Sequence, residues 1–247
     1  EDFWLRKNYF KRHFDLIDGF ISPSEFLRQR YIQWGIKEDE IIVIENGQKA
    51  ISPLDPRLLQ AGEKRNRFAY FGQVNPYKGI DILMEALRSM TKEDRSTMSV
   101  EIHGANLEVQ SGEFQEKVKL LAKKFIKEGT VRWVGPYRPE EQLARMKEID
   151  WVIVPSIWWE NSPMVIQEAF TAGRPLIVSN IGGMKEKVKD GIDGLHFSAR
   201  NPSDLASKML LASKSDMLWD DCVNNITKPI TYKDCANEHY EFFSSKS

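Results

Sequence analysis

The stretch FAYFGQVNPYKGIDILMEALRSM, residues 68–90, decides the fold of this chain. Its first part, FAYFG, is a short apolar run rich in aromatic residues, which is typical of a buried β-strand. Its second part, KGIDILMEALRSM, repeats apolar residues at the three- and four-residue spacing of an amphipathic helix. We therefore predict a strand over 68–72, a glycine-bearing turn, and a helix over 78–90.

The same alternation of an apolar run and an amphipathic segment recurs along the chain. The further strand candidates are MSVEIHG (98–104), TVRWVG (130–135), DWVIVPS (150–156), RPLIVSN (174–180) and DGLHFSA (193–199). This pattern predicts an α/β fold, a doubly wound six-stranded parallel Rossmann-like sheet with helices on both faces. In such sheets ligands bind beyond the carboxyl ends of the strands, where the strand order reverses.

The two ends of the chain depart from this pattern. Residues 1–47 hold only two strand candidates, LIDGFIS and EIIVIENG, so we interpret them as the C-terminal remnant of a preceding N-terminal domain. Residues 48–213 are expected to form the Rossmann-like domain, and residues 214–247 to form helices that pack back toward the N-terminal domain. Because the chain begins Glu1-Asp2 without a methionine, we expect a fragment or a processed product.

Composition limits the class of partner. Lys and Arg total 35 against 36 for Asp and Glu, so net charge gives no support for nucleic acid or an anionic membrane as a partner. The only cysteines, Cys222 and Cys235, form no CxxC or Cys/His cluster, which disfavours a disulfide scaffold and a structural zinc. No apolar run approaches the roughly 18 residues of a spanning helix. We expect a cytoplasmic setting.

The loop FGQVNPYKG, residues 71–79, is the first candidate for chemistry. It follows a predicted strand and opens a helix, so Lys78 and the backbone N–H groups at the helix start could hold a phosphate. The equally supported alternative is a plain turn with an exposed lysine. The loop matches neither GxGxxG nor GxxxxGK[ST], so neither dinucleotide binding nor P-loop chemistry follows.

The stretch WWENSPMVIQEAF, residues 158–170, is the second candidate. With Ser162 as the N-cap and Pro163 as the first helical residue, Glu160 lies in the loop and Glu168 in the second helical turn. Pro163 and Glu168 are separated by a rise of about 7.5 Å, so the two carboxylates favour separate points along a polyhydroxylated ligand. The alternative is one acid at a helix N-terminus and one exposed helical glutamate.

These motifs together resemble a known family. Residues 15–212 resemble the C-terminal, donor-binding half of retaining glycosyltransferases with the two-domain GT-B fold, the glycosyl transferases group 1 or glycogen synthase-like family four. The resemblance is carried by FGQVNPYKGIDILMEAL, by VRWVGPYRPEEQLARMKEIDWVIVPS, and by the E-x7-E stretch with its continuation, ENSPMVIQEAFTAGRPLIVSNIGGMKEKVKDGIDGLHF. FDLIDGFISPSEF through IIVIENG resembles the last strand-helix-strand of the N-terminal, acceptor-binding domain.

The resemblance implies a role for each matching residue. Glu160 would meet hydroxyls of the transferred sugar, Glu168 those of the ribose, and Lys78 the diphosphate, which makes Lys78 and Glu160 the catalytic candidates. The full donor-binding set is Gly72, Gln73, Lys78, Gly104, Gly135, Pro136, Tyr137, Glu160, Asn161, Ser162, Pro163, Met164, Val165 and Glu168. Gln73 departs from the arginine usual in the family, and Arg138 or Arg174 are the candidates to replace that contact. Asn161-Ser162 also departs from the common Phe-Gly, which leaves the sugar undetermined.

The implied reaction is transfer of a hexose-type sugar from a nucleoside diphosphate sugar to an acceptor hydroxyl, with retention and with no metal or other cofactor. The acceptor would be a saccharide, a lipid-linked glycan or another hydroxyl compound, bound through the N-terminal domain. Contact with the inner face of a membrane would also occur only through that domain, and the isolated chain would transfer poorly. A nucleotide-sugar epimerase of the same fold and a non-catalytic nucleotide-binding module are the alternatives. Trp158 and Trp159 are expected to pack at the rim of a cleft, with substrate stacking as the alternative, and His103 is expected to be a satisfied near-core histidine, with ligand contact as the alternative.

Overall fold

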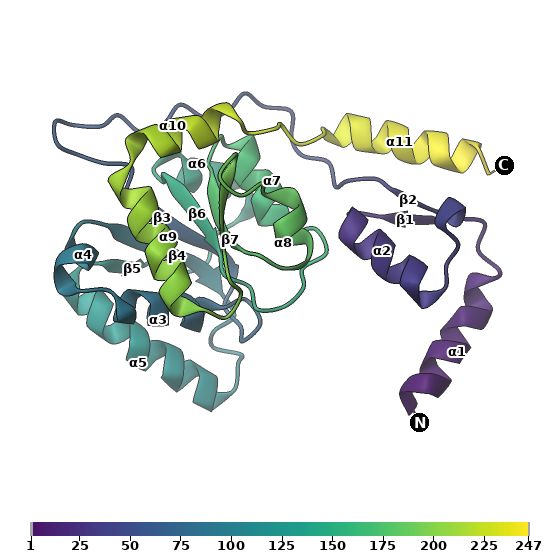
Figure 1. The fold of residues 1–247 in the computed structure, drawn as a ribbon, viewed down its shortest axis with the longest axis horizontal. Coiled ribbons are helices and arrows are strands. Elements are labelled where there is room, and N and C mark those ends of the chain that lie inside the picture. The colour runs from purple at the N-terminus through teal and green to yellow at the C-terminus, as the bar shows by residue number, and fades with distance from the viewer. Residues whose placement is uncertain (1, 247) are drawn as a thin grey trace. The chain divides into compact units, whose positions relative to one another are not determined.

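The computed structural model describes residues 2–246, which divide into two compact units (Figure 1). A large unit spans Ile51–Pro229, and a small unit is formed by residues 2–50 together with 230–246. The large unit holds a six-stranded sheet and the small unit holds a two-stranded one. No helix among residues 2–246 combines the length and the apolar character needed to cross a bilayer.

The sheet of the large unit is entirely parallel, with the strand order β5-β4-β3-β6-β7-β8. Its strands are β3 (Arg67–Gln73), β4 (Ser99–Ala105), β5 (Val131–Trp133), β6 (Trp151–Val154), β7 (Leu176–Ser179) and β8 (Gly194–Phe197). Each strand falls within or overlaps a predicted apolar run. The predicted α/β fold with a six-stranded parallel sheet is therefore confirmed.

Helices cover both faces of this sheet (Figure 1). One face packs on α3 (Ile80–Ser89), α5 (Gly112–Glu128), α9 (Pro202–Lys214) and α10 (Asp216–Asn224), with the short α4 (Lys92–Ser96) after α3. The other face packs on α6 (Pro139–Lys147), α7 (Met164–Thr171) and α8 (Gly182–Lys187). Along β3, Phe68 and Tyr70 enter the first core, and Ala69 and Phe71 enter the second. This alternation explains why the strand is apolar throughout, because both of its faces are buried.

A buried ion cluster fixes the segment that enters the sheet. Asp150 is 1% exposed. Its carboxylate forms ion pairs with Arg57 (Nη2 to Oδ2, 3.0 Å) and Arg65 (Nη1 to Oδ1, 3.3 Å). The Asp150 backbone carbonyl also accepts a hydrogen bond from Trp219 Nε1 at 2.8 Å, which attaches α10 to the sheet. A buried carboxylate is tolerated when it is paired in this way. The cluster therefore joins the segment before β3, the start of β6 and α10.

The small unit is built from both ends of the chain. Its elements are α1 (Asp2–Phe14), β1 (Phe20–Ser22), α2 (Glu25–Trp34), the 3-10 helix η1 (Glu38–Glu40), β2 (Ile41–Val43) and α11 (Tyr232–Ser244). β1 and β2 pair in parallel, and Gln48 exchanges backbone hydrogen bonds with Ile230 and Tyr232 at 2.8 and 2.9 Å. The stretch 214–247 is thus divided, because α10 belongs to the large unit and α11 to the small unit.

Candidate functional site

A cavity of about 620 Å³ opens at the carboxyl ends of β3 and β6. These neighbouring strands form the switch point of the sheet, because the chain passes from β3 outward to β4 and β5 and then returns to β6 beside β3. Crossover helices on either side of such a point leave a crevice between the two loops. The cavity thus lies where the sequence predicts a ligand site.

Most of the expected donor-binding residues line this one cavity. The ten that do are Gly72, Gln73, Lys78, Tyr137, Glu160, Ser162, Pro163, Met164, Val165 and Glu168. The four outside the lining are Gly104, Gly135, Pro136 and Asn161. Gly104 and Asn161 lie one layer behind it: a Cβ on Gly104 would be 3.1 Å from the Gly72 carbonyl oxygen, and the Asn161 carbonyl packs against Gly183. Lining residues absent from the expected set are Tyr70, Phe71, Ala105, Pro139, Gln142, Ile153, Val154 and Ser156.

Lys78 and Glu160 form an ion pair across the cavity, although 82 residues separate them in the chain. Lys78 Nζ lies 2.7 Å from Glu160 Oε1, and Ser156 Oγ donates to the same oxygen at 2.9 Å. The pair forms because Gly79, with a φ of +71°, lets the start of α3 approach the Pro155 carbonyl. Neither contact uses Glu160 Oε2, so that oxygen remains available to a ligand.

The N-terminus of α7 presents unpaired donors to the same cavity. The prediction that Ser162 caps this helix is wrong: the helix begins at Met164, Pro163 occupies the N-cap position, and no side chain caps it. In the part of the chain that the structure describes, the Ser162 hydroxyl is buried without a hydrogen-bond partner. The N–H groups of Met164 and Val165 precede the first bonded amide, Ile166, as expected for the first turn of a helix. Such a helix end favours an anion.

Glu168 projects from α7 into a less solvated part of the cavity. Its Oε2 accepts a hydrogen bond from Gln142 Nε2 at 2.6 Å. Burial raises the pKa of Glu168 above its ordinary value of 4.5, and the Gln142 bond opposes that rise. Burial, together with the charge of Glu168, raises the pKa of Tyr137 to about 12, so the phenol stays protonated and can donate. This end of the cavity therefore offers one carboxylate acceptor and one hydroxyl donor.

The raised pKa of Glu168 gives a stability prediction that is independent of any ligand. A raised folded-state pKa means that folding favours the protonated form, so this contribution is full below the unfolded-state pKa and is lost as pH rises through the folded-state pKa. We expect Glu168→Gln, which keeps the acceptor for Gln142, to melt at a higher temperature than wild type at pH 7. The gain should vanish below about pH 4.5, the ordinary glutamate pKa.

Glu141 supplies a control of opposite sign for this measurement. Hydrogen bonds from Arg138 and Arg145 lower the pKa of its carboxyl, so its contribution is present above the ordinary pKa and is lost as pH falls. Glu141→Gln should therefore melt at a lower temperature than wild type at pH 7 and should match it in acid. Scanning calorimetry between pH 3 and pH 8 measures both differences. A Glu168→Gln chain that is less stable than wild type at pH 7 contradicts the assignment.

The cavity carries a single cation. Of the described residues that line it, Lys78 alone has a cationic side chain. Neither arginine suggested as a replacement at position 73 lines the cavity. Arg174 is 1% exposed and donates to the carbonyls of residues 54, 55, 146, 147, 172 and 173. Arg138 pairs with Glu141. Arg174 cannot supply the contact because backbone carbonyls occupy its donors, and Arg138 lies at the surface with its side chain 79% exposed.

His103 and Trp158 differ in how deeply they are buried. His103 is a satisfied near-core residue, as expected: it stacks on Phe71 at 4.5 Å, and its two nitrogens meet Glu101 at 2.8 Å and Arg145 at 3.2 Å. Trp158, by contrast, does not pack in the core. The residue is 61% exposed, and its ring packs edge to face on the Tyr77 ring with centroids 5.6 Å apart, so it packs on a surface neighbour.

Sequence comparison identifies the family. The profile described as Glycosyl transferases group 1 matches residues 54–228, which is well over half of the chain and includes every residue that lines the cavity. The chain belongs to the glycosyl transferases group 1 family. The resemblance drawn from the motifs is therefore confirmed.

Relatives of this glycosyl transferases group 1 chain carry transferase names. It is 31% identical to the lipopolysaccharide 1,2-N-acetylglucosaminetransferase of Salmonella typhimurium over 194 residues, which are 74% of this chain and 50% of that protein. It is 28% identical to a D-inositol 3-phosphate glycosyltransferase of Corynebacterium aurimucosum over 234 residues, which are 91% of this chain and 52% of that protein. The chain thus spans about half the length of these relatives. Neither name supports the epimerase alternative.

Solved structures show the same fold. Anabaena Alr3699/HepE, in complex with UDP and glucose, matches with a TM-score of 0.75 at 21% identity, over 92% of this chain and 63% of that chain. The lipopolysaccharide outer core galactosyltransferase WaaB, in its apo form, matches with a TM-score of 0.71 at 19% identity, over 92% of this chain and 62% of that chain. The predicted GT-B type of fold is confirmed for this glycosyl transferases group 1 chain.

Proposed function

We propose that this chain is the donor-binding half of a retaining glycosyltransferase that moves a hexose-type sugar from a nucleoside diphosphate sugar to an acceptor hydroxyl. One observation carries the proposal: a cation, two unpaired helix amides and two separated carboxylates converge on a single cavity at the switch point. This arrangement suits a ligand with an anionic centre and a hydroxylated group on each side. The UDP and glucose in the Anabaena structure support the donor class.

Each lining group has a role in this proposal. The diphosphate lies between Lys78 Nζ and the N–H groups of Met164 and Val165, where the helix dipole favours negative charge. Lys78 then shifts its ion pair from Glu160 to the phosphate, and Glu160 accepts hydroxyls of the sugar. Glu168 accepts the ribose hydroxyls, and the Tyr137 loop flanks the base. Gly135 and Pro136, which precede Tyr137 in the chain, lie near the base in this proposal, and Gly104 and Asn161 pack against Gly72 and Gly183.

The transfer step requires a charge to be stabilised as it forms. The bond between the anomeric carbon and the diphosphate oxygen breaks, and its electron pair stays on the diphosphate. The acceptor oxygen bonds to the anomeric carbon, and its hydroxyl proton goes to the departing diphosphate. Because charge on the diphosphate grows in the transition state, Lys78 and the fixed helix amides stabilise that state more than the ground state. These groups supply the stabilisation in the proposal without a metal ion.

The acceptor in this proposal is a saccharide, a lipid-linked glycan or another hydroxyl compound. It is bound mainly by an N-terminal domain outside this chain, and any membrane contact is made by that domain. Closure of the two domains brings the acceptor hydroxyl to the anomeric carbon and excludes water. The chain alone therefore binds donor but transfers sugar poorly.

Calorimetry of the chain with UDP, GDP and ADP sugars in EDTA tests the donor proposal. We expect at least one of these sugars to bind without Mg²⁺. Lys78→Ala should weaken that binding roughly 10- to 100-fold, because it removes a charge-assisted contact worth about 1.5–3 kcal/mol. Glu168→Ala should weaken it in the same direction. Lys117→Ala is the matched control, since Lys117 pairs with Asp81 outside the cavity lining. Absence of binding by all three classes of sugar overturns the proposal.

A further inference from the structure

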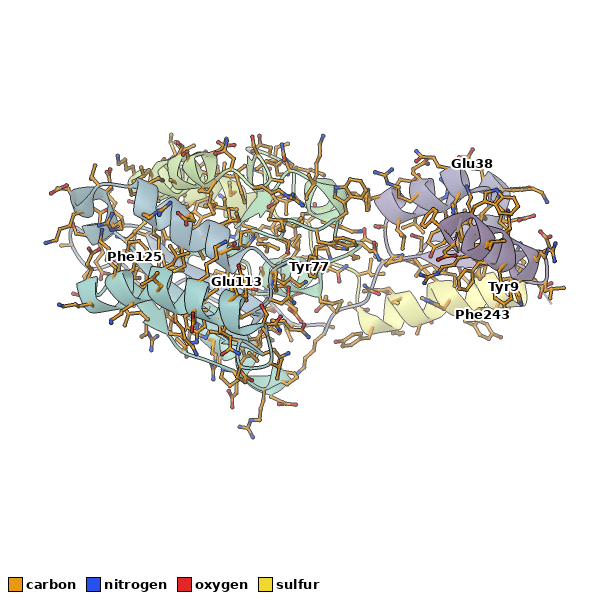
Figure 2. All side chains as sticks on the ribbon, turned by 90° about the horizontal axis from the view of Figure 1, so that it is seen from below. Tyr9, Glu38, Tyr77, Glu113, Phe125 and Phe243 are labelled. Atoms are coloured by element: carbon orange, nitrogen blue, oxygen red, sulfur yellow. The ribbon has the colours of Figure 1, made fainter. Side chains whose placement is uncertain are left out.

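Three large aromatic side chains stand in solvent beside the donor cavity. Tyr77, Trp158 and Trp159 are 59%, 61% and 54% exposed, and Tyr77 is labelled on the large unit in Figure 2. Trp151 and Trp219 of the same unit are buried, at 0% and 3% exposure. Scattered exposed apolar residues are ordinary, but exposed aromatic residues gathered on the loops that supply a ligand cavity suit a binding surface.

The three rings belong to the two loops that form the reactive end of the cavity. Tyr77 directly precedes Lys78, and Trp159 directly precedes Glu160. The Tyr77 and Trp158 rings meet edge to face with centroids 5.6 Å apart, while Lys78 and Glu160 meet at 2.7 Å. The same pair of loops therefore makes one ionic contact at the cavity and one aromatic contact at the surface. Consecutive Cα atoms are about 3.8 Å apart, so the backbones of Tyr77 and Trp159 lie next to the two residues of the ion pair.

These loops are held in place by backbone contacts. Ile157 N donates to the Tyr77 carbonyl at 2.9 Å, and Gly183 N donates to the Glu160 carbonyl at 2.6 Å. A Cβ on Gly183 would lie 2.0 Å from the Asn161 carbonyl oxygen, so α8 and the 157–161 loop touch backbone to backbone. The tryptophans are therefore presented by a fixed support, which is the property that a recognition surface needs.

We propose that Tyr77, Trp158 and Trp159 form an aromatic platform that binds a pyranose ring of the acceptor saccharide; the inference rests on the proposed function. A pyranose presents a face of C–H bonds, whose partial positive charge suits the negative face of an aromatic ring. The platform carries no ionised group, which fits a neutral sugar better than a phosphate. The acceptor hydroxyl must reach the anomeric carbon of the donor sugar. Because Glu160 contacts that sugar in the proposed function, the acceptor ring has to lie close to Glu160. Trp159 directly precedes Glu160 in the chain, so the loop that carries the tryptophans reaches this position.

Binding of neutral oligosaccharides to the chain tests whether the aromatic platform holds a pyranose ring. The probe is an array of immobilised neutral oligosaccharides incubated with the labelled chain and saturating UDP, followed by calorimetry with the best-bound glycan. We expect Trp158→Ala and Trp159→Ala to weaken glycan binding at least tenfold and Trp158→Phe to retain part of it. Trp4→Ala is the matched control, because Trp4 is 66% exposed and lies in the small unit. The melting temperature of each variant checks that it is folded.

Measuring the UDP affinity of the same variants distinguishes a failure of this inference from a failure of the proposed function. UDP affinity should change less than twofold in the platform variants, since the rings lie outside the cavity lining. A parallel loss of UDP affinity would assign the rings to the nucleotide and overturn the platform. Binding of no neutral glycan, or equal binding by a Trp158→Ala/Trp159→Ala double variant, also overturns it. If the chain binds no nucleoside diphosphate or its sugars, the proposed function itself fails, and the platform as an acceptor subsite fails with it.

Discussion

Asp150→Ala is expected to lower the free energy of unfolding of the large unit by about 3–5 kcal/mol, because it removes the buried counter-charge of two guanidinium groups and leaves Arg57 only its more exposed partner Glu63. The Arg57 and Arg65 side chains are only 4% and 10% exposed, and Asp150 is their shared partner. The Arg67 backbone N–H, which donates to Asp150 Oδ2 at 3.0 Å, would also lose its acceptor. The damage would fall on the amino ends of β3 and β6, at the edge of the sheet opposite the cavity.

Thermal melting provides the measurement for Asp150→Ala. A loss of about 1 kcal/mol shifts the melting temperature of a domain of this size by roughly 2–4 °C, so a fall of about 10 °C is expected. Glu63→Ala is the matched control, since Glu63 pairs with the same Arg57 but its side chain is 37% exposed, and its loss should be far smaller. Equal falls in melting temperature for the two variants would show that the buried Asp150 ion pairs stabilise the large unit no more than the exposed Glu63 pair does.

The sheet could be predicted from the sequence because its strands are buried on both faces. A run such as FAYFG is apolar throughout, and the structure sends alternate residues of it into two separate cores. The place of the cavity followed from the same pattern, since the carboxyl ends of parallel strands share one edge. Local spacing was therefore sufficient for the fold and for the region of the site.

The pairing of side chains in the site could not be read from local spacing. Lys78 meets Glu160 across 82 residues, and Gln142 meets Glu168 across 26. Gln142 carries no sequence signal of its own, because its role arises only when α6 and α7 pack on the same face of the sheet. Long-range contacts of this kind depend on the strand order, which is a property of the whole chain.

Solvent exposure was the other property that the sequence left open. Arg174 was considered for the cavity, yet it is enclosed among backbone carbonyls behind the sheet. Trp158, by contrast, is 61% exposed and packs on Tyr77 at the surface, whereas Trp151 and Trp219 are buried. Arginine and tryptophan both combine an apolar body with polar groups, so either can be buried or exposed. The surrounding backbone decides whether such a side chain is buried or exposed, and the periodicity of the sequence does not predict that backbone arrangement.

Gly79→Ala is expected to destabilise the large unit by about 2–5 kcal/mol and to separate Lys78 from Glu160. A Cβ at this position would lie 1.9 Å from the Pro155 carbonyl oxygen, which is backbone and cannot rotate away. The φ of +71° adds the strain of a left-handed conformation that alanine adopts poorly. Overpacking of a fixed contact adds a further cost of about 1–3 kcal/mol. To relieve both, the start of α3 must move away from the loop after β6.

Gly129→Ala separates the two causes, because Gly129 has a similar φ of +81° and a Cβ on it would meet no atom within 4 Å. It should show only the left-handed strain, about 1 kcal/mol, and should keep the donor affinity of wild type. Gly79→Ala should lose both stability and donor affinity, since Lys78 directly precedes the displaced residue. Thermal melting and calorimetry with the donor sugar measure the pair of variants. Similar melting temperatures for the two would mean that conformation, and not the approach of α3 to Pro155, makes glycine necessary at position 79.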